Sequence, residues 1–210
     1  MAPPTFDRSV FINCPFDEDY APILQAILFC IVYLGLQPRL ATERIDSGDV
    51  RIAKIQDLIE NSKYSIHDLS RCQATAAGEH YRLNMPFELG IDYACRRYFG
   101  HGRDAKRILV LEEKPYRYQA ALSDLAGCDI SPHGGDFQKA IRAVRNWLVS
   151  EAHVPGVGAQ KIINAYTTEF QEWYYERQRA NGFSEEDILD YPTSELLAAM
   201  QEWVEWGKLI

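Results

Sequence analysis

Hydrophobic and polar positions along the first 150 residues recur in two periods, one typical of strands and one typical of helices. Short runs rich in β-branched and aromatic residues predict strands, and each run is followed by a longer one with apolar positions at helical spacing. The predicted strands are SVFIN (9–13), QPRLATE (37–43), YSIHDLS (64–70), KRILVLEE (106–113) and CDISPHG (128–134). The predicted helices are 20–34, 47–62, a segment that starts at Asn84, 116–127 and 136–149.

Strands that alternate with helices in this way predict an α/β domain, with a parallel sheet covered by helices on both faces. The second strand contains Pro38, which cannot donate a backbone hydrogen bond, so we expect it near an edge of the sheet.

The character of the chain changes after Ser150, where EAHVPGVGAQ holds a proline and two glycines and predicts a hinge. Beyond it, Lys161 to Arg179 predicts an aromatic-rich helix, and Thr193 to Trp206 predicts another. Two helices bury little core alone. We therefore expect an α/β domain in 1–150 and a helical extension in 151–210 that packs on the core or on a second copy, which would make the protein a homo-oligomer.

Composition narrows the possible partners. The formal charge of −8 at pH 7 argues against a protein that grips a nucleic-acid duplex, because that affinity comes from clustered Lys and Arg. The five cysteines and five histidines show no metal-ligand spacing, so we expect no metal and no cofactor. No signal-peptide pattern occurs, and the longest apolar run is interrupted by Pro22 and Gln25, which predicts a cytoplasmic protein without a membrane span.

Polar and aromatic residues follow the predicted strands at their carboxyl ends, where open parallel sheets bind ligands. Loops are polar in any case, so each residue is also compatible with a purely structural role. The candidate substrate-binding residues are Asn13, Phe16, Asp46, Arg51, His67, Ser70, Arg71 and Asn84. Arg51 and Arg71 are candidates for holding a phosphate, because a guanidinium offers a fork of donors to phosphate oxygens.

Asp68 and Glu88 are the candidate catalytic residues. Asp68 and His67 interrupt the pattern of a buried strand. A buried carboxylate at this position needs hydrogen-bond donors, so Asp68 is either a loop or helix cap or part of a functional site. Glu88 lies one residue beyond the capping-box position of a helix with Asn84 as its N-cap. Gly90 costs a helix about 1 kcal/mol relative to alanine, which predicts a close approach by a strand or a ligand.

An ionised glutamate among apolar neighbours suits displacement at the anomeric carbon of a ribose, where the transition state resembles an oxocarbenium ion. In that chemistry Asp68 would orient a ribose hydroxyl or handle the proton.

YSIHDLS, followed about twenty residues later by MPFELGIDYA, resembles the nucleoside 2-deoxyribosyltransferase family and also Toll/interleukin-1 receptor (TIR) domains. The resemblance covers roughly residues 9–148 and implies a flavodoxin-like three-layer fold with a five-stranded parallel sheet in the order 2-1-3-4-5. It implies Glu88 as the nucleophile or oxocarbenium-stabilising carboxylate and Asp68 as the sugar-orienting acid. The opening of the chain also resembles bacterial TIR-like proteins, which implies a role in nucleotide-depleting antiphage defence.

Two functions remain open from the sequence. The first is an N-glycosidase that cleaves the ribose–base bond of a nucleotide, a nucleoside or NAD, with water as acceptor. The alternative is a non-catalytic nucleotide sensor or assembly module with the same fold, in which a salt bridge would engage Glu88. Serine hydrolase chemistry is excluded from both because the chain contains no G-x-S-x-G elbow.

Overall fold

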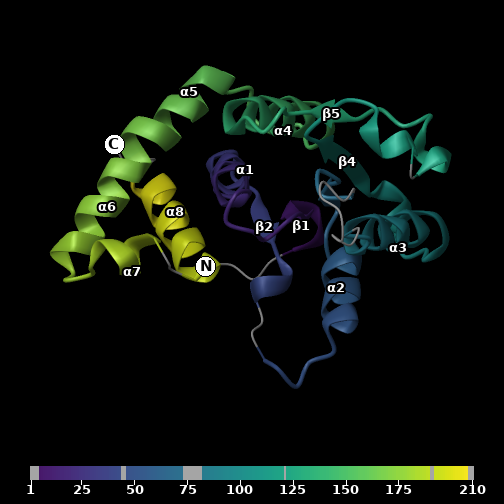
Figure 1. Cartoon of the computed structure of the whole chain (residues 1–210), viewed down its shortest axis with the longest axis horizontal. Coiled ribbons are helices and arrows are strands. Elements are labelled where there is room, and N and C mark those ends of the chain that lie inside the picture. The colour runs from purple at the N-terminus through teal and green to yellow at the C-terminus, as the bar shows by residue number, and fades with distance from the viewer. Residues whose placement is uncertain (1–4, 44–45, 73–81, 121, 190–191, 208–210) are drawn as a thin grey trace, which may run out of the picture.

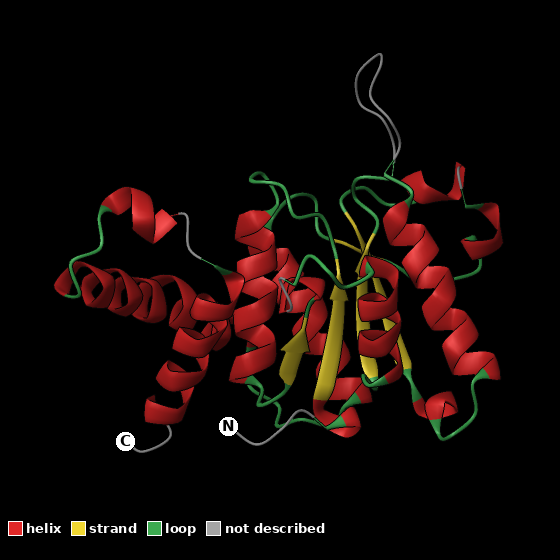
Figure 2. Cartoon of the chain, turned by 90° about the horizontal axis from the view of Figure 1, so that it is seen from below, coloured by secondary structure: helices red, strands yellow, loops and turns green. Residues whose placement is uncertain are grey.

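The computed structural model describes residues 5–43, 46–72, 82–120, 122–189 and 192–207 and is built around one parallel sheet. The strand order is β2-β1-β3-β4-β5, and every neighbouring pair is parallel, as the arrows of Figure 2 show. The strands are β1 Ser9–Asn13, β2 Gln37–Arg39, β3 Tyr64–Asp68, β4 Arg107–Glu112 and β5 Ser131–Pro132. The predicted flavodoxin-like α/β fold, its strand order and the edge position of the second strand are confirmed.

Helices cover both faces of the sheet and extend beyond it (Figure 1). The α-helices are α1 Ala21–Tyr33, α2 Arg51–Glu60, α3 Asn84–Tyr98, α4 Phe137–Glu151, α5 Ala159–Asn164, α6 Gln171–Ala180, α7 Glu185–Leu189 and α8 Thr193–Gly207. A π-helical segment, Ala165–Phe170, joins α5 to α6. Short 3-10 turns occupy Phe6–Arg8, Ala41–Glu43, Arg103–Ala105, Arg117–Ala120 and Ser123–Leu125.

Alternation of side chains along the strands divides the core between the two faces. Val10 and Ile12 of β1 join the cluster formed with α1 and α4, whereas Phe11 between them packs with α2 and α3. In β3, Ile66 points toward α1, so His67 and Asp68 at its carboxyl end fall on opposite faces. This split decides which partners the two residues meet.

In its described residues, 116–120 and 122–127, the segment 116–127 differs from its prediction because it forms two 3-10 turns in place of an α-helix. Tyr118 is the reason, since its ring is buried and its hydroxyl donates to the carbonyl oxygens of Leu125 and Cys128 at 3.1 and 3.2 Å. A continuous helix would carry those carbonyls away from the ring. The predicted fifth strand, 128–134, shortens to two residues after this turn.

The helix starts also differ in part from their predictions. Asp136, the first residue of the predicted helix 136–149, is the N-cap of α4, with Oδ1 accepting from the amides of Gln138 and Lys139. In contrast, Asn84 is the first residue of α3, and the N-cap position belongs to Leu83, which has no side-chain cap. Val50 takes the corresponding position of α2. Glu88 therefore lies in the second turn of α3, one residue deeper than the sequence predicts.

The C-terminal helices share the core of the α/β domain. Every residue of α1 from Ala26 to Val32 is buried, so this helix needs cover on all sides. The sheet and α4 supply part of it, and Figure 1 shows α6 and α8 on the side of α1 away from the strands. Phe29 of α1 contacts the rings of Phe170 and Trp203, with centroids 5.2 and 5.7 Å apart. This aromatic cluster joins the extension to the sheet domain.

We expect Phe170→Ala to destabilise the whole fold by about 3–5 kcal/mol, because it removes a buried ring from the contact between α1 and the C-terminal helices. Phe183 is 43% exposed and provides the control, since Phe183→Ala should stay within about 0.5 kcal/mol of the parent. Urea unfolding followed by circular dichroism measures both. Equal midpoints for the two variants would contradict the shared core.

Candidate functional site

Among the described residues, four acidic side chains are buried: Asp68, Asp92 and Glu112, each 0% exposed, and Glu88, 6% exposed. A carboxylate taken out of water is costly unless hydrogen-bond donors or cations replace the water. The partners of each carboxyl group therefore show its role. A carboxyl group with partners from the protein stabilises the fold, and one without such partners is a candidate for binding a ligand.

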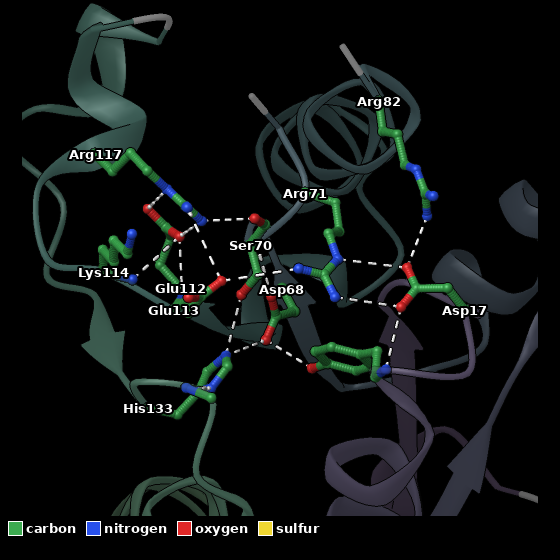
Figure 3. Close-up of polar contacts among 12 residues, drawn as sticks. Asp17, Asp68, Ser70, Arg71, Arg82, Glu112, Glu113, Lys114, Arg117 and His133 are labelled. Carbon is green, nitrogen blue, oxygen red and sulfur yellow. Dashed lines mark hydrogen bonds and ion pairs between the residues drawn. The ribbon is translucent and has the colours of Figure 1, made fainter. Parts of the chain in front are cut away.

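Asp68 is enclosed by donors from three segments (Figure 3). Its Oδ2 accepts from the Tyr20 hydroxyl at 2.6 Å and lies 3.0 Å from His133 Nε2, and its Oδ1 accepts from the Ser70 amide at 2.8 Å. Burial alone raises the pKa of Asp68, but the hydrogen bonds from His133, Ser70 and Tyr20 outweigh it and lower the pKa below its usual value. Asp68 is an ionised carboxylate whose donors come from its own chain.

The tautomer of His133 follows from its neighbours. The amide of Gly135 donates to Nδ1 at 3.1 Å, so the ring hydrogen is on Nε2, which faces both Asp68 and the Ser70 hydroxyl, 3.1 Å away. A nucleophilic serine needs an acceptor nitrogen, with the carboxylate on the other nitrogen of the ring. Ser70, His133 and Asp68 therefore do not form a catalytic triad, in agreement with the exclusion of serine hydrolase chemistry.

Glu112 is also fully partnered. It forms an ion pair with Arg117 and accepts from the backbone amides of Glu113 at 2.9 Å and Lys114 at 3.3 Å. Arg117 donates in addition to the carbonyl of Ser70 at 2.6 Å, which connects the loop after β4 to the loop after β3. Arg117 thus stabilises the loops at this edge of the sheet (Figure 3).

Arg71, a candidate for binding phosphate, is held by acidic residues. Figure 3 shows Arg71 and Arg82 converging on Asp17, with nitrogen–oxygen distances of 3.3 and 2.8 Å. Glu113 lies 3.9 Å from Arg71 on its other side. Partial burial raises the pKa of Asp17, but the guanidinium groups of Arg71 and Arg82 have the larger effect and lower the pKa below its usual value. The carboxylate of Asp17 is therefore ionised. A phosphate would have to displace Asp17 in order to reach Arg71.

Asp92, on the other face of the sheet, is held by His67 and Lys106. Its Oδ2 lies 2.9 Å from His67 Nε2, and its Oδ1 lies 3.2 Å from Lys106 Nζ. Burial alone raises the pKa of Asp92, and the hydrogen bond from His67 together with the charge of Lys106 reverses that effect and lowers it. Lys106 is itself 0% exposed and also donates to the carbonyls of Ile59, at 2.7 Å, and Ser62.

Glu88 differs from the other three. In the part of the chain that the structure describes, its carboxyl group makes no hydrogen bond and no ion pair. Burial raises its pKa to about 7, although the positive charge of Arg51 at the start of α2 lowers it. Burial, followed by the charges of Asp68, Glu88 and Asp17, also raises the pKa of the Cys14 thiol well above its usual value, so this thiol is neutral. Glu88 is the buried acid that these residues leave without a partner.

The structure divides the predicted site residues into three groups. Ser70 and Arg71 join Asp68 on the α1 side, while Asn13 and His67 lie on the α3 side, where Asn13 Nδ2 contacts His67 Nδ1 at 3.0 Å. The remaining predicted residues are exposed around this edge: Phe16, Asp46, Arg51 and Asn84. No strand makes the close approach predicted at Gly90, because no described atom lies within 4 Å of the position a Cβ would take there.

Several residues of the site escaped the sequence analysis. Asp92 had a usable signal, since it lies one turn after Glu88 on the same helix face. Tyr20, His133 and Lys106 had none, because their roles depend on which loops meet at the sheet edge. A cation buried completely beside a carboxylate cannot be read from the local sequence.

Comparisons with protein-family models, curated proteins and solved structures find no match to this chain. Within the described ranges, no helix has the length and apolar character needed to cross a membrane. The same residues contain no group of three or more His, Cys, Asp or Glu side chains suited to a metal ion. A function for this chain must therefore be inferred from the geometry of its carboxyl groups.

We expect Asp68→Asn to destabilise the fold by about 3–5 kcal/mol, because it weakens the buried hydrogen bonds from Tyr20 and His133. A lowered pKa contributes stability that is present above about pH 4 and is lost as pH falls, so the parent and the variant should converge at acid pH. Chemical unfolding between pH 3 and 8 tests this. Asp7→Asn, which removes an exposed ion pair with Lys63, should change stability by less than about 1 kcal/mol at any pH.

Glu88→Gln should have the opposite effect. The folded chain keeps the carboxyl proton up to about pH 7, whereas an unfolded chain releases it near pH 4.3, so Glu88 increasingly destabilises the fold as pH rises between these values. We expect equal Tm values for parent and variant at pH 4, and a gain for the variant at pH 8 of about 1–2 kcal/mol, or several degrees. The exposed Glu172 gives the control Glu172→Gln, and a gain for Glu88→Gln that is independent of pH would contradict the raised pKa.

Proposed function

We propose that the chain is an N-glycosidase that cleaves the bond between ribose and base in a nucleotide, a nucleoside or NAD, with Glu88 as the catalytic carboxylate. One observation carries this proposal: of the four buried acids described, Glu88 alone has no partner among the described side chains. It belongs to the helix after β3, on the α2 and α3 side of the sheet, which agrees with the resemblance to nucleoside 2-deoxyribosyltransferases and TIR domains.

The chemistry follows from the missing partner. As the bond to the base breaks, positive charge develops at C1 of the ribose, and an ionised Glu88 would either stabilise that charge or bond to the carbon. The substrate itself carries less charge at C1, so the interaction strengthens toward the transition state, as catalysis requires. Water then attacks C1 and completes hydrolysis, and the proton that water loses passes to the carboxylate or to solvent.

The leaving base limits the choice of substrate. A neutral purine or pyrimidine leaves more easily when a side chain gives it a proton, but the nearby hydrogens of Tyr20 and His133 are already donated to Asp68. Asp68 is ionised, because its pKa is lowered. A base that is already cationic, as in NAD, needs no such proton. Among the proposed substrates, this arrangement favours those with a cationic base.

The phosphate-binding residue and the biological role complete the proposal. Arg51 is exposed and its charge reaches Glu88, so it is the better candidate for holding a phosphate of the substrate, while Arg71 is paired with Asp17. A cytoplasmic role in nucleotide-depleting defence, with assembly into homo-oligomers, belongs to the same proposal through the resemblance to bacterial TIR-like proteins.

The enclosure of Asp68 favours the alternative, a non-catalytic nucleotide sensor. The resemblance implies Asp68 as a second acid that orients the sugar, yet both of its oxygens accept hydrogen bonds from the protein. A site with one available carboxyl group can bind a ribosyl ligand without turning it over. The sensor keeps the same fold and the same candidate ligands.

Incubation of the purified protein with NAD and with a panel of neutral nucleosides and nucleotides, followed by chromatography of the free base, tests the proposal. We expect release of base from NAD, and loss of that release by about 100-fold or more in Glu88→Gln, because the variant cannot carry the negative charge. The value of kcat/KM should rise with pH through about 7 as Glu88 ionises.

Glu172→Gln serves again as the control and should release base at the parental rate. Equal release by the parent and by Glu88→Gln would remove Glu88 from the mechanism. If no compound is cleaved but calorimetry detects binding of NAD or a nucleotide, the sensor function replaces the glycosidase.

A further inference from the structure

The first turn of α3, which leads to Glu88, has no side-chain N-cap, and Met85 is the apolar residue that packs from it into the core. Leu83 in the N-cap position provides no side-chain hydrogen bond to the free amides. Leu83 and Phe87 are 59% and 62% exposed, so apolar packing of these two residues does not fix the turn. Gly90 weakens the following turn by about 1 kcal/mol relative to alanine. A helix that begins in this way would fray unless another element held it.

Asn13, the last residue of β1, provides that contact. Its side chain is buried, and Nδ2 donates to the carbonyl oxygen of Met85 in the first turn of α3 at 2.9 Å. Because a carbonyl oxygen only accepts, this contact fixes which end of the amide is the nitrogen. The same nitrogen lies 3.0 Å from His67 Nδ1, so this ring atom is the acceptor of the second amide hydrogen.

His67 extends the connection further along α3. With Nδ1 accepting, the ring hydrogen is on Nε2, which donates to Asp92 Oδ2 at 2.9 Å. Asp92 is fixed in turn by Lys106, which also binds the carbonyl of Ile59 near the end of α2. The side chains of this network are at most 4% exposed, so water does not compete with its hydrogen bonds.

The network formed by Asn13, His67, Asp92 and Lys106 contacts α3 on both sides of Glu88 along the helix. Met85 precedes Glu88 by three residues and Asp92 follows it by four, spacings that put all three on one face of the helix. The contact of Met85 with Asn13 of β1 therefore fixes the helix before Glu88, and the contact of Asp92 with His67 of β3 fixes it after Glu88. The sequence predicts Asn13 and His67 as substrate-binding residues, but the contacts described here are used within the protein.

We infer that Asn13 and His67 are positioning residues, which hold the start of α3 so that Glu88 stays in its buried place at the carboxyl edge of the sheet. The catalytic meaning of this inference rests on the proposed function, while the structural effect can be measured without it. Loss of the contact from Asn13 to Met85 would free the first turn, and water would then reach the carboxyl group of Glu88.

Asn13→Leu keeps the approximate size of the side chain and removes its donor. Carbon-13 NMR titration of the glutamate carboxyl groups, with Glu88→Gln to assign the signal, measures the pKa of Glu88. We expect about 7 in the parent and a fall of one unit or more in Asn13→Leu, because hydration favours the ionised form. Phe170→Ala destabilises the fold without removing any contact of this network and is the matched control, in which the pKa of Glu88 should stay at the parental value.

An unchanged pKa in Asn13→Leu would overturn the inference and leave the proposed function untouched. An ordinary pKa of Glu88 in the parent would also overturn the inference, whereas the proposed function is tested separately by base release from NAD. If Asn13→Leu does not fold, Asn13→Ser replaces it, because its shorter side chain does not span the distance to both Met85 and His67. Where base release from NAD is observed, Asn13→Leu should lower kcat by about 10- to 100-fold with little change in KM, as expected for a misplaced catalytic group.

Discussion

Carboxyl groups at the carboxyl edge of this sheet must replace the water that they lose on folding, and most of the polar architecture serves that requirement. Tyr20 and His133 supply Asp68, Arg117 supplies Glu112, and the pair of His67 and Lys106 supplies Asp92. The contacts of Asp68 and Glu112 join loops that follow β1, β3, β4 and β5, so they also set the shape of the edge, whereas Lys106 reaches Asp92 from just before β4. Glu88 is significant by contrast with these three acids. The fold provides each of them with donors or cations, whereas the carboxyl group of Glu88 has no such partner among the described side chains.

The alternation of β3 gives the site its two-sided organisation. Consecutive residues of a strand point to opposite faces, and His67 and Asp68 consequently belong to separate hydrogen-bond networks. The network of Asp68 binds the loops on the α1 side to one another. The network of His67 fixes α3. A change at either residue therefore acts on a different part of the edge, even though the two are neighbours in the chain.

The sequence was sufficient for the fold because strands and helices of different period alternate clearly, and because Pro38 marks an edge strand. It was sufficient for Glu88 as a candidate because an acid among apolar neighbours on a helix is conspicuous. It was not sufficient for the partners. Whether Asp68 is free or enclosed depends on His133, which is 65 residues away in the chain. Hydrogen bonds between distant loops follow from the strand order and the exact lengths of the connections, and local patterns contain neither.

The position of α1 has a consequence for how the protein is made. This helix, near the beginning of the chain, is buried from Ala26 to Val32, and part of its cover comes from α8 at Thr193–Gly207. A ribosome that synthesises the chain releases α1 long before α8, so the nascent sheet domain exposes this apolar surface until α8 has also emerged. The core around α1 is therefore completed only once α8 has been made, and until then its apolar surface is open to chaperones.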